Sequence, residues 1–390
     1  MGSEIVLVIC STLIIAYIFD LTSKKTKIPS VILLLLLGWL VKQIILILKI
    51  ELPDFNYLLP IVGTIGLVMI VLEGSLELEL HSSKKKMIFK SSILAFLPMI
   101  ALSFLIASVF SYWGGFSFKN SLICSIPISI ISSAIAIPSS NSFSAANREV
   151  VIYETSLSDI LGVLFFNFVA LNEFINLYAV ADFFSQVIIM VIISLFSTLI
   201  IAWLFPKIDH HIKFIPVILV VVIIYMFSKI FHLPGLIFIL LFGLFVGNID
   251  KLKYLNIKWM KVDPDSLLLE SHKFRDMVVE ISFLIRSLFF LIFGYLLQLN
   301  EIFNIQTIFW SLFVIAAIYA IRYISIKLLR FPVNPMFYIA PRGLITILLF
   351  LSIMPDQLIP VVNKSLIIQV IILSIIIMSF GLIKIKASTN

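Results

Sequence analysis

Apolar runs long enough to cross a lipid bilayer recur along almost all of the 390-residue chain. A transmembrane helix needs about 20 predominantly apolar residues, and residues 28–48 and 364–383 are two stretches that provide them. Only 13% of the residues are charged, about half the share of a typical soluble domain. The short segments of alternating polarity that build a membrane β-barrel are absent from the sequence. The sequence therefore predicts an all-α polytopic membrane protein.

Thirteen membrane spans are predicted, and the charged loops between them set their direction. With the N-terminus outside, the outer loops hold only Lys49, Lys119, Lys229 and Lys364, while the inner loops hold most of the other Lys and Arg residues. Such an excess marks the cytoplasmic side. We expect a multi-pass protein of the plasma (inner) membrane with a cytoplasmic C-terminus, and the net charge of +7 then requires no nucleic acid. The spans lie at about residues 4–20, 28–48, 57–79, 87–112, 118–139, 148–170, 181–205, 212–231, 234–248, 274–298, 304–329, 335–354 and 364–383.

A weak internal repeat divides this single domain of residues 1–390. Pro29 and Gly38 in the second span have the same spacing as Pro234 and Gly243 in the ninth. The third and tenth spans also correspond, so the copies lie seven helices apart and cross the bilayer in opposite directions. Inverted repeats of this kind are typical of secondary transporters. We place repeat one at about residues 1–170, a linker helix at about 181–205 and repeat two at about 212–383.

Two spans in corresponding places of the repeats carry helix-breaking residues. The span at 118–139 contains Pro127, Ser132–Ser133 and Pro138, and the span at 335–354 contains Pro335, Pro341 and Gly343. Proline removes a backbone donor and frees a carbonyl at membrane depth. The alternative is a pair of ordinary kinked helices. Matching interruptions in both halves favour broken helices that cross near the midplane and form a transport site.

Asp159 is the most informative single residue, because it lies in the apolar span at 148–170. A carboxylate at the bilayer centre costs about 2.5–3.5 kcal/mol on insertion scales, so it needs a partner, a cation or a proton. Thr155 precedes it by four residues on the same helix face, so its hydroxyl could join an oxygen-ligand site. This pattern indicates ion or proton transport, and a purely structural ion pair is the alternative.

Other charged residues reach similar depths on neighbouring spans. Glu154 and Arg342 each lie about two turns in from the inner side, so they could form a buried ion pair. Arg286 reaches the depth of Asp159 and could hold it charged, or compete with a cation for it. Glu73 is a further candidate partner of Asp159. For Arg286 and Glu73 a structural role remains equally open.

Nothing in the sequence predicts an enzyme or a resident metal. We find no Ser–His, Cys–His or phosphate-loop arrangement. The five histidines show no ligand spacing, so we expect no metal beyond a transported cation. No cofactor is predicted.

Three motifs in order resemble the monovalent cation:proton antiporters, the sodium/proton exchanger superfamily. Residues 154–159, Glu-Thr-Ser-Leu-Ser-Asp, are similar to the family's Glu-Ser-x-x-Asn-Asp motif. Residues 289–294 resemble its Phe-Phe-x-x-x-Gly segment, and residues 340–344 resemble its Arg-Gly segment. The likeness covers nearly the whole chain.

The resemblance implies a mechanism and an assembly. Asp159 would bind a proton and a cation in turn, with Thr155 as a cation ligand and Glu154–Arg342 as a structural pair. We place Ser158 and Glu73 in the same cation- and proton-binding site. The resemblance also implies a homodimer, elevator-like alternating access with a moving core of the fourth to sixth and eleventh to thirteenth helices, and no cofactor.

Two departures from the family pattern affect the expected ion chemistry. Ser158 stands where the family has Asn or Asp, and a missing second aspartate favours electroneutral exchange. The span at 118–139 lacks the acid of the family's Thr-Asp-Pro motif, which removes a hard oxygen ligand. Sodium is the expected cation, and potassium stays open. A non-transporting membrane sensor or interaction subunit on the same scaffold is the alternative function, and a channel is a third.

Overall fold

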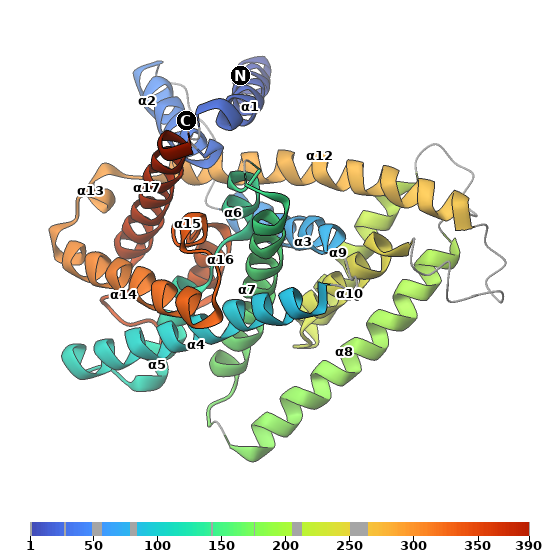
Figure 1. The fold of residues 1–390 in the computed structure, drawn as a ribbon. Coiled ribbons are helices and arrows are strands. Elements are labelled where there is room, and N and C mark those ends of the chain that lie inside the picture. The colour runs from blue at the N-terminus through green and yellow to red at the C-terminus, as the bar shows by residue number, and fades with distance from the viewer. Residues whose placement is uncertain are drawn as a thin grey trace. The chain divides into compact units, whose positions relative to one another are not determined.

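The computed structural model is all-helical throughout its described residues, which are 2–26, 29–48, 57–78, 84–141, 143–174, 176–204, 213–249 and 264–389. The predicted span ends at residues 28, 79, 205 and 212 lie outside these ranges. The helices (Figure 1) are α1 (Gly2–Thr26), α2 (Ser30–Leu48), α3 (Leu58–Glu77), α4 (Lys85–Gly114), α5 (Phe118–Ser129), α6 (Ser133–Ser139), α7 (Ala145–Leu171), α8 (Leu177–Leu204), α9 (Phe214–Ile230), α10 (Gly235–Gly247), α12 (Pro264–Leu296), α13 (Leu299–Ile302), α14 (Ile305–Leu329), α15 (Val333–Met336), α16 (Leu344–Ser352) and α17 (Lys364–Thr389).

Helices long and apolar enough to span a bilayer occur at most of the predicted spans. Within the described ranges, nine helices are long and apolar enough to cross a bilayer, and Leu7–Ser23, Phe214–Ile230 and Gly235–Gly247 are shorter apolar helices. The all-α polytopic class is therefore confirmed. The count of thirteen stays a prediction, because several spans are short or divided.

The chain forms two compact units. The first contains Met1–Thr64, Ile88–Ala170 and Leu284–Asn390, and the second contains Ile65–Met87 and Leu171–Phe283. In the first unit α17 packs on α13, α14, α15 and α16, while α16 also packs on α5. In the second unit α10 packs on α8 and α9, and the rings of Phe238, Phe242 and Phe274 form part of its core.

Both predicted helix interruptions occur in the structure, and in each the backbone becomes extended. Between α5 and α6 the backbone at Ile130 is extended, with φ −80° and ψ 133°. Between α15 and α16 the chain leaves the helix until Gly343, whose φ of −169° is also extended. Pro127 and Pro138 lie inside α5 and α6 rather than at the break. In this pair of helices the break is therefore made by the residues between the prolines.

Glycine contacts support the internal repeat. A Cβ on Gly38 of α2 would lie 2.8 Å from Tyr295 N of α12, next to Gly294. A Cβ on Gly243 of α10 would lie 2.7 Å from the Ser75 Cβ of α3. Gly38 and Gly243 are the repeat-equivalent positions, and so are the segments that they touch. Only glycine allows such close backbone approach. The repeat boundaries themselves stay a prediction.

Candidate functional site

The two broken helices meet through their backbones in the first unit. The amide of Ser132, in the break before α6, donates to the carbonyl of Pro341 over 2.9 Å. Gly343 follows two residues later, and a Cβ there would lie 2.9 Å from Ser132 Oγ. The crossing therefore requires glycine for close approach. Unpaired backbone groups in a bilayer are tolerated only where protein or water satisfies them, and this crossing satisfies one such donor.

Asp159 of α7 lies at the start of α6. Its side chain is only 1% exposed. Its Oδ2 accepts the backbone N–H of Ser133 over 3.2 Å and the Ser133 hydroxyl as well. Ser133 is the first residue of α6, where a helix leaves N–H donors without intrahelical acceptors. The carboxylate is thus held by the broken helix.

The second oxygen of Asp159 differs from the first. Within the described part of the chain Oδ1 is buried and has no hydrogen-bond partner. A buried carboxylate oxygen left in this state costs free energy. A proton or a cation bound to Oδ1 would remove that cost. Oδ1 is therefore the atom of Asp159 at which either could bind.

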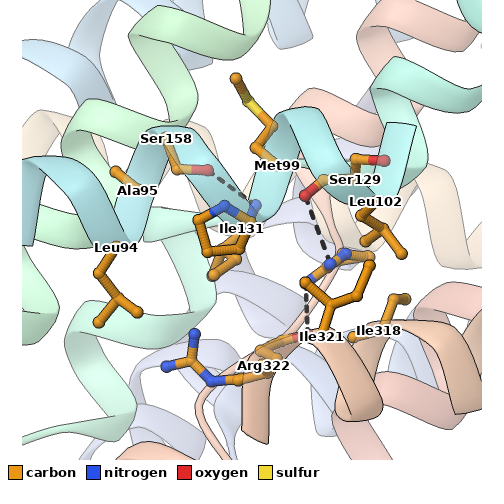
Figure 2. A pocket seen from close by; sticks show the side chains of 13 residues that line it. Leu94, Ala95, Met99, Leu102, Ser129, Ile131, Ser158, Ile318, Ile321 and Arg322 are labelled. Atoms are coloured by element: carbon orange, nitrogen blue, oxygen red, sulfur yellow. Dashed lines mark hydrogen bonds between the residues drawn. The ribbon is translucent and has the colours of Figure 1, made fainter. Parts of the chain in front are cut away.

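Ser158, the neighbour of Asp159, satisfies a second donor of the break. Its Oγ accepts the backbone N–H of Ile131 over 3.1 Å (Figure 2). Ser158 and Asp159 are both buried. Two consecutive side chains of α7 therefore replace the helical acceptors that Ile131 and Ser133 lack.

Thr155 lies one turn before Asp159 and is fully buried. Its hydroxyl donates to Val151 O over 2.8 Å within α7. The hydroxyl proton is thereby occupied, while the oxygen keeps lone pairs that can accept or ligate. Its predicted role as a cation ligand stays a prediction.

The predicted Glu154–Arg342 pair is replaced by a different one. Arg322 of α14 donates Nη1 to Glu154 Oε1 over 2.6 Å and Nη2 to Oε2 over 3.2 Å. Glu154 is 0% exposed and Arg322 is 4% exposed, so the pair is buried and bidentate. Arg322 also donates from Nε to Met336 O over 2.8 Å.

Arg342 instead supports the broken helices through carbonyl groups. Its Nε donates to Ile128 O over 2.7 Å, Nη1 to Ala340 O over 2.8 Å and Nη2 to Ser129 O over 3.4 Å. Ile128 and Ser129 end α5, where the last carbonyls lack helical donors. A guanidinium with five donors suits this task. Arg342 does not pair with Glu154, because it lies at the crossing of the broken helices and its guanidinium donates to these three carbonyls instead.

Two further predicted residues are not joined to Asp159 by hydrogen bonds. The bonds that Asp159 accepts come from Ser133, and Arg286 of α12 donates neither of them. Arg286 is half-buried in the first unit. Glu73 of α3 is half-buried in the second unit. The roles of Arg286 and Glu73 at the site stay predictions.

A small pocket adjoins the crossing (Figure 2). Its volume is about 20 Å³, and Ser158, Ser129, Arg322 and Arg342 line it together with apolar side chains. This is room for about one water molecule with several polar partners. The pocket thus has room for a water molecule beside the two arginines and beside Ser158.

Sequence reasoning missed two residues of this arrangement. In the sequence Ser133 stands out only as part of a helix break, and nothing marks Arg322 as the partner of Glu154. The available signal for Ser133 was its place at the start of a half-helix. No signal separated Arg322 from the other arginines of similar depth. Within the described ranges, no three His, Cys, Asp or Glu side chains gather as a metal site.

The fold and the site together define a class: a multi-pass helical membrane protein with two interrupted helices crossing beside a buried carboxylate. The transmembrane sodium/hydrogen exchanger model matches residues 9–385. The chain therefore belongs to the sodium/hydrogen exchanger family, which is a family of transporters rather than enzymes.

Solved structures agree on the fold. The chain resembles the sodium proton antiporter MjNhaP1 from Methanocaldococcus jannaschii at pH 8, with a TM-score of 0.71 and 18% identity over 97% of this chain and 100% of that one. An electron-microscopy map of the same antiporter gives a TM-score of 0.70 and 17% identity over 100% of this chain and 96% of that one. No curated protein matches the sequence.

Proposed function

We propose that the protein is a secondary antiporter that exchanges a monovalent cation for protons at Asp159. The observation that carries the proposal is the buried Oδ1 of Asp159, which has no hydrogen-bond partner among the described residues, while Oδ2 is held by Ser133. A proton and a cation would compete for the same carboxylate. Each would displace the other, which is the minimum that coupled exchange requires.

The proposed ligands are oxygen atoms around Asp159. Ser133 is a positioning residue that can also turn its hydroxyl oxygen towards a cation. Ser158 and Thr155 supply further hydroxyl oxygens on α7. Oxygen is the donor that hard cations prefer. Sodium is the proposed cation, and the absence of any acid from residues 118–139 keeps potassium open.

One-for-one exchange is the proposed stoichiometry. Glu154 is neutralised by the guanidinium of Arg322 over 2.6 Å, so it is unavailable to bind an ion. Ser158 adds no charge. Asp159 then binds either one proton or one monovalent cation, and the charge of the loaded site is the same in both cases. This supports electroneutral exchange.

Alternating access is proposed to move a core that includes the crossing. The family resemblance assigns α4–α7 and α14–α17 to that core and implies a homodimer. The hydrogen bond from Ser132 N to Pro341 O supports movement of both broken helices as one body. We place the protein in the plasma (inner) membrane with its N-terminus outside and its C-terminus in the cytoplasm.

Everted vesicles with a preformed proton gradient test the function. Sodium, lithium or potassium is added, and the recovery of a pH-sensitive dye is followed. We expect cation-dependent recovery in wild type and its loss in Asp159→Asn. The matched control is Asp182→Asn, which changes an exposed carboxylate of α8. The order of the cations gives the selectivity.

Three results would contradict the proposal. Full exchange in Asp159→Asn would remove Asp159 from the mechanism. No exchange with any cation, in wild-type protein shown to be folded and monodisperse, would favour a non-transporting sensor or interaction subunit. Flux that never saturates and needs no counter-ion would favour a channel.

A further inference from the structure

A second pocket of the first unit is apolar and larger than the one beside Ser158. Its volume is about 230 Å³, and it lies between α2, the segment that joins α12 to α13, and α17. Leu35, Trp39, Leu297, Ile302, Ile372 and Ile375 are among the side chains that line it, and the rest of the lining is aliphatic. Apolar cavities of about 150 Å³ stay dry and bind small hydrocarbons. An ion or a water cluster is therefore excluded as the occupant.

The rim of this pocket consists of exposed apolar side chains. Leu36 is 53% exposed, Leu299 is 48% exposed and Ile376 is 37% exposed. Both α2 and α17 are candidate membrane spans. Exposed apolar side chains on two candidate spans would border the hydrocarbon of a bilayer, which supplies acyl chains of the chemistry that the lining accepts.

A cationic side chain stands beside the same pocket. Lys42 follows Trp39 by three residues, which places both on one face of α2. It is the only charged residue of α2. Its Nζ donates to the carbonyl of Leu297, a lining residue, over 3.1 Å. An ammonium group has three donors, and Lys42 forms no ion pair with a described acidic residue.

The position of Lys42 fits the edge of the membrane. It lies six residues before the end of α2 at Leu48, about 9 Å along the axis. Leu297 immediately follows the end of α12 at Leu296. A lysine at this depth directs its ammonium group towards the interface, where lipid phosphates lie.

We propose that this pocket binds one acyl chain of an anionic phospholipid, whose phosphate pairs with Lys42. The apolar lining selects the hydrocarbon, and the lysine, attached to the same wall, selects the anionic headgroup. The proposal is independent of the exchange mechanism, because it uses neither Asp159 nor the crossing.

Native mass spectrometry of delipidated protein tests the site. The protein is titrated with phosphatidylglycerol and, separately, with phosphatidylcholine. We expect one tight phosphatidylglycerol per chain in wild type and weaker phosphatidylcholine binding. Lys42→Gln should reduce phosphatidylglycerol affinity about tenfold, because a charge-assisted contact is lost. Phosphatidylcholine affinity should fall much less, because its choline cation already offsets the phosphate charge.

Blocking variants test the acyl-chain part of the site. Leu36→Trp and Ile376→Trp enlarge exposed rim side chains on opposite walls, so folding should be preserved, and each should weaken both lipids. The matched controls are Leu312→Trp, at a lipid-facing residue of α14 that is 52% exposed, and Lys229→Gln, at an exposed lysine of α9. The controls should bind as wild type does.

Three results would overturn the proposal. Equal retention of both lipids by wild type would show only annular lipid. Unchanged phosphatidylglycerol binding in Lys42→Gln would remove the headgroup contact. Equal losses in Leu36→Trp and Leu312→Trp would remove the pocket as the site.

Discussion

The buried ion pair between Glu154 and Arg322 can be tested quantitatively through its contribution to stability. Arg322 forms two hydrogen bonds to the carboxylate and one to Met336 O. Removing one member of a buried pair costs about 3–5 kcal/mol, because the other charge is left without compensation. We therefore expect Glu154→Leu and Arg322→Met each to reduce the free energy of unfolding by about that amount.

The double variant separates the pair from its surroundings. Glu154→Leu with Arg322→Met leaves no buried charge from the pair, and replacing both members by apolar side chains is often close to neutral. The lost donor to Met336 O adds about 1–3 kcal/mol. The double variant should then be more stable than either single variant. The coupling free energy between the two substitutions should be about 3 kcal/mol or more, at the upper end of the values found for residues in contact.

Unfolding by SDS in detergent, followed by tryptophan fluorescence, measures these free energies. A second cycle crosses Glu154→Leu with Arg342→Met, since Arg342 donates to the carbonyls of Ile128, Ser129 and Ala340 instead. The coupling free energy of this second cycle should be clearly smaller than that of the Glu154–Arg322 cycle. If the second cycle gave the larger coupling free energy, Glu154 would pair with Arg342 and not with Arg322.

Four further variants test the crossing and the helix contacts. Gly38→Leu should destabilise the protein by several kcal/mol in the same SDS assay, because its side chain would overlap the main chain of α12, and a near-neutral effect would refute this close approach. Ser158→Ala should cost about 1–3 kcal/mol by leaving the N–H of Ile131 without its acceptor, whereas Ser158→Asn should restore most of that loss. Ser133→Ala should raise the cation concentration for half-maximal dye recovery several-fold while protein yield is kept, and an unchanged concentration would exclude its hydroxyl from the site.

The sequence predicted the features that depend on local chemistry. Long apolar runs predict spans, because the bilayer leaves backbone groups no other partners. The Pro and Gly spacing predicted the repeat, and the breaks near Ser132 and Gly343 occur in the predicted helices. Asp159 was identified because a buried carboxylate is costly wherever its helix packs.

The partner of Glu154 could not be predicted in the same way. Residue counting along a helix gives depth in the membrane, and several arginines have similar depths. Which one reaches Glu154 depends on how α14 and α7 are rotated and packed, and the sequence does not contain that information directly. Ser133 was missed for a related reason, since its role depends on how α7 packs against the start of α6.

Ser158 shows which part of the site the fold constrains and which part it leaves variable. The break exposes the N–H of Ile131, and the hydroxyl of Ser158 accepts it over 3.1 Å. A hydroxyl, an amide or a carboxylate can each accept this bond. The fold therefore requires an acceptor at this position but does not require a charge.

With a neutral acceptor at Ser158 and Glu154 neutralised by Arg322, binding of a proton or of a monovalent cation at Asp159 changes the charge of the site by the same amount. The proposed electroneutral exchange thus follows from which side chains cap the broken helix, rather than from any change in the fold.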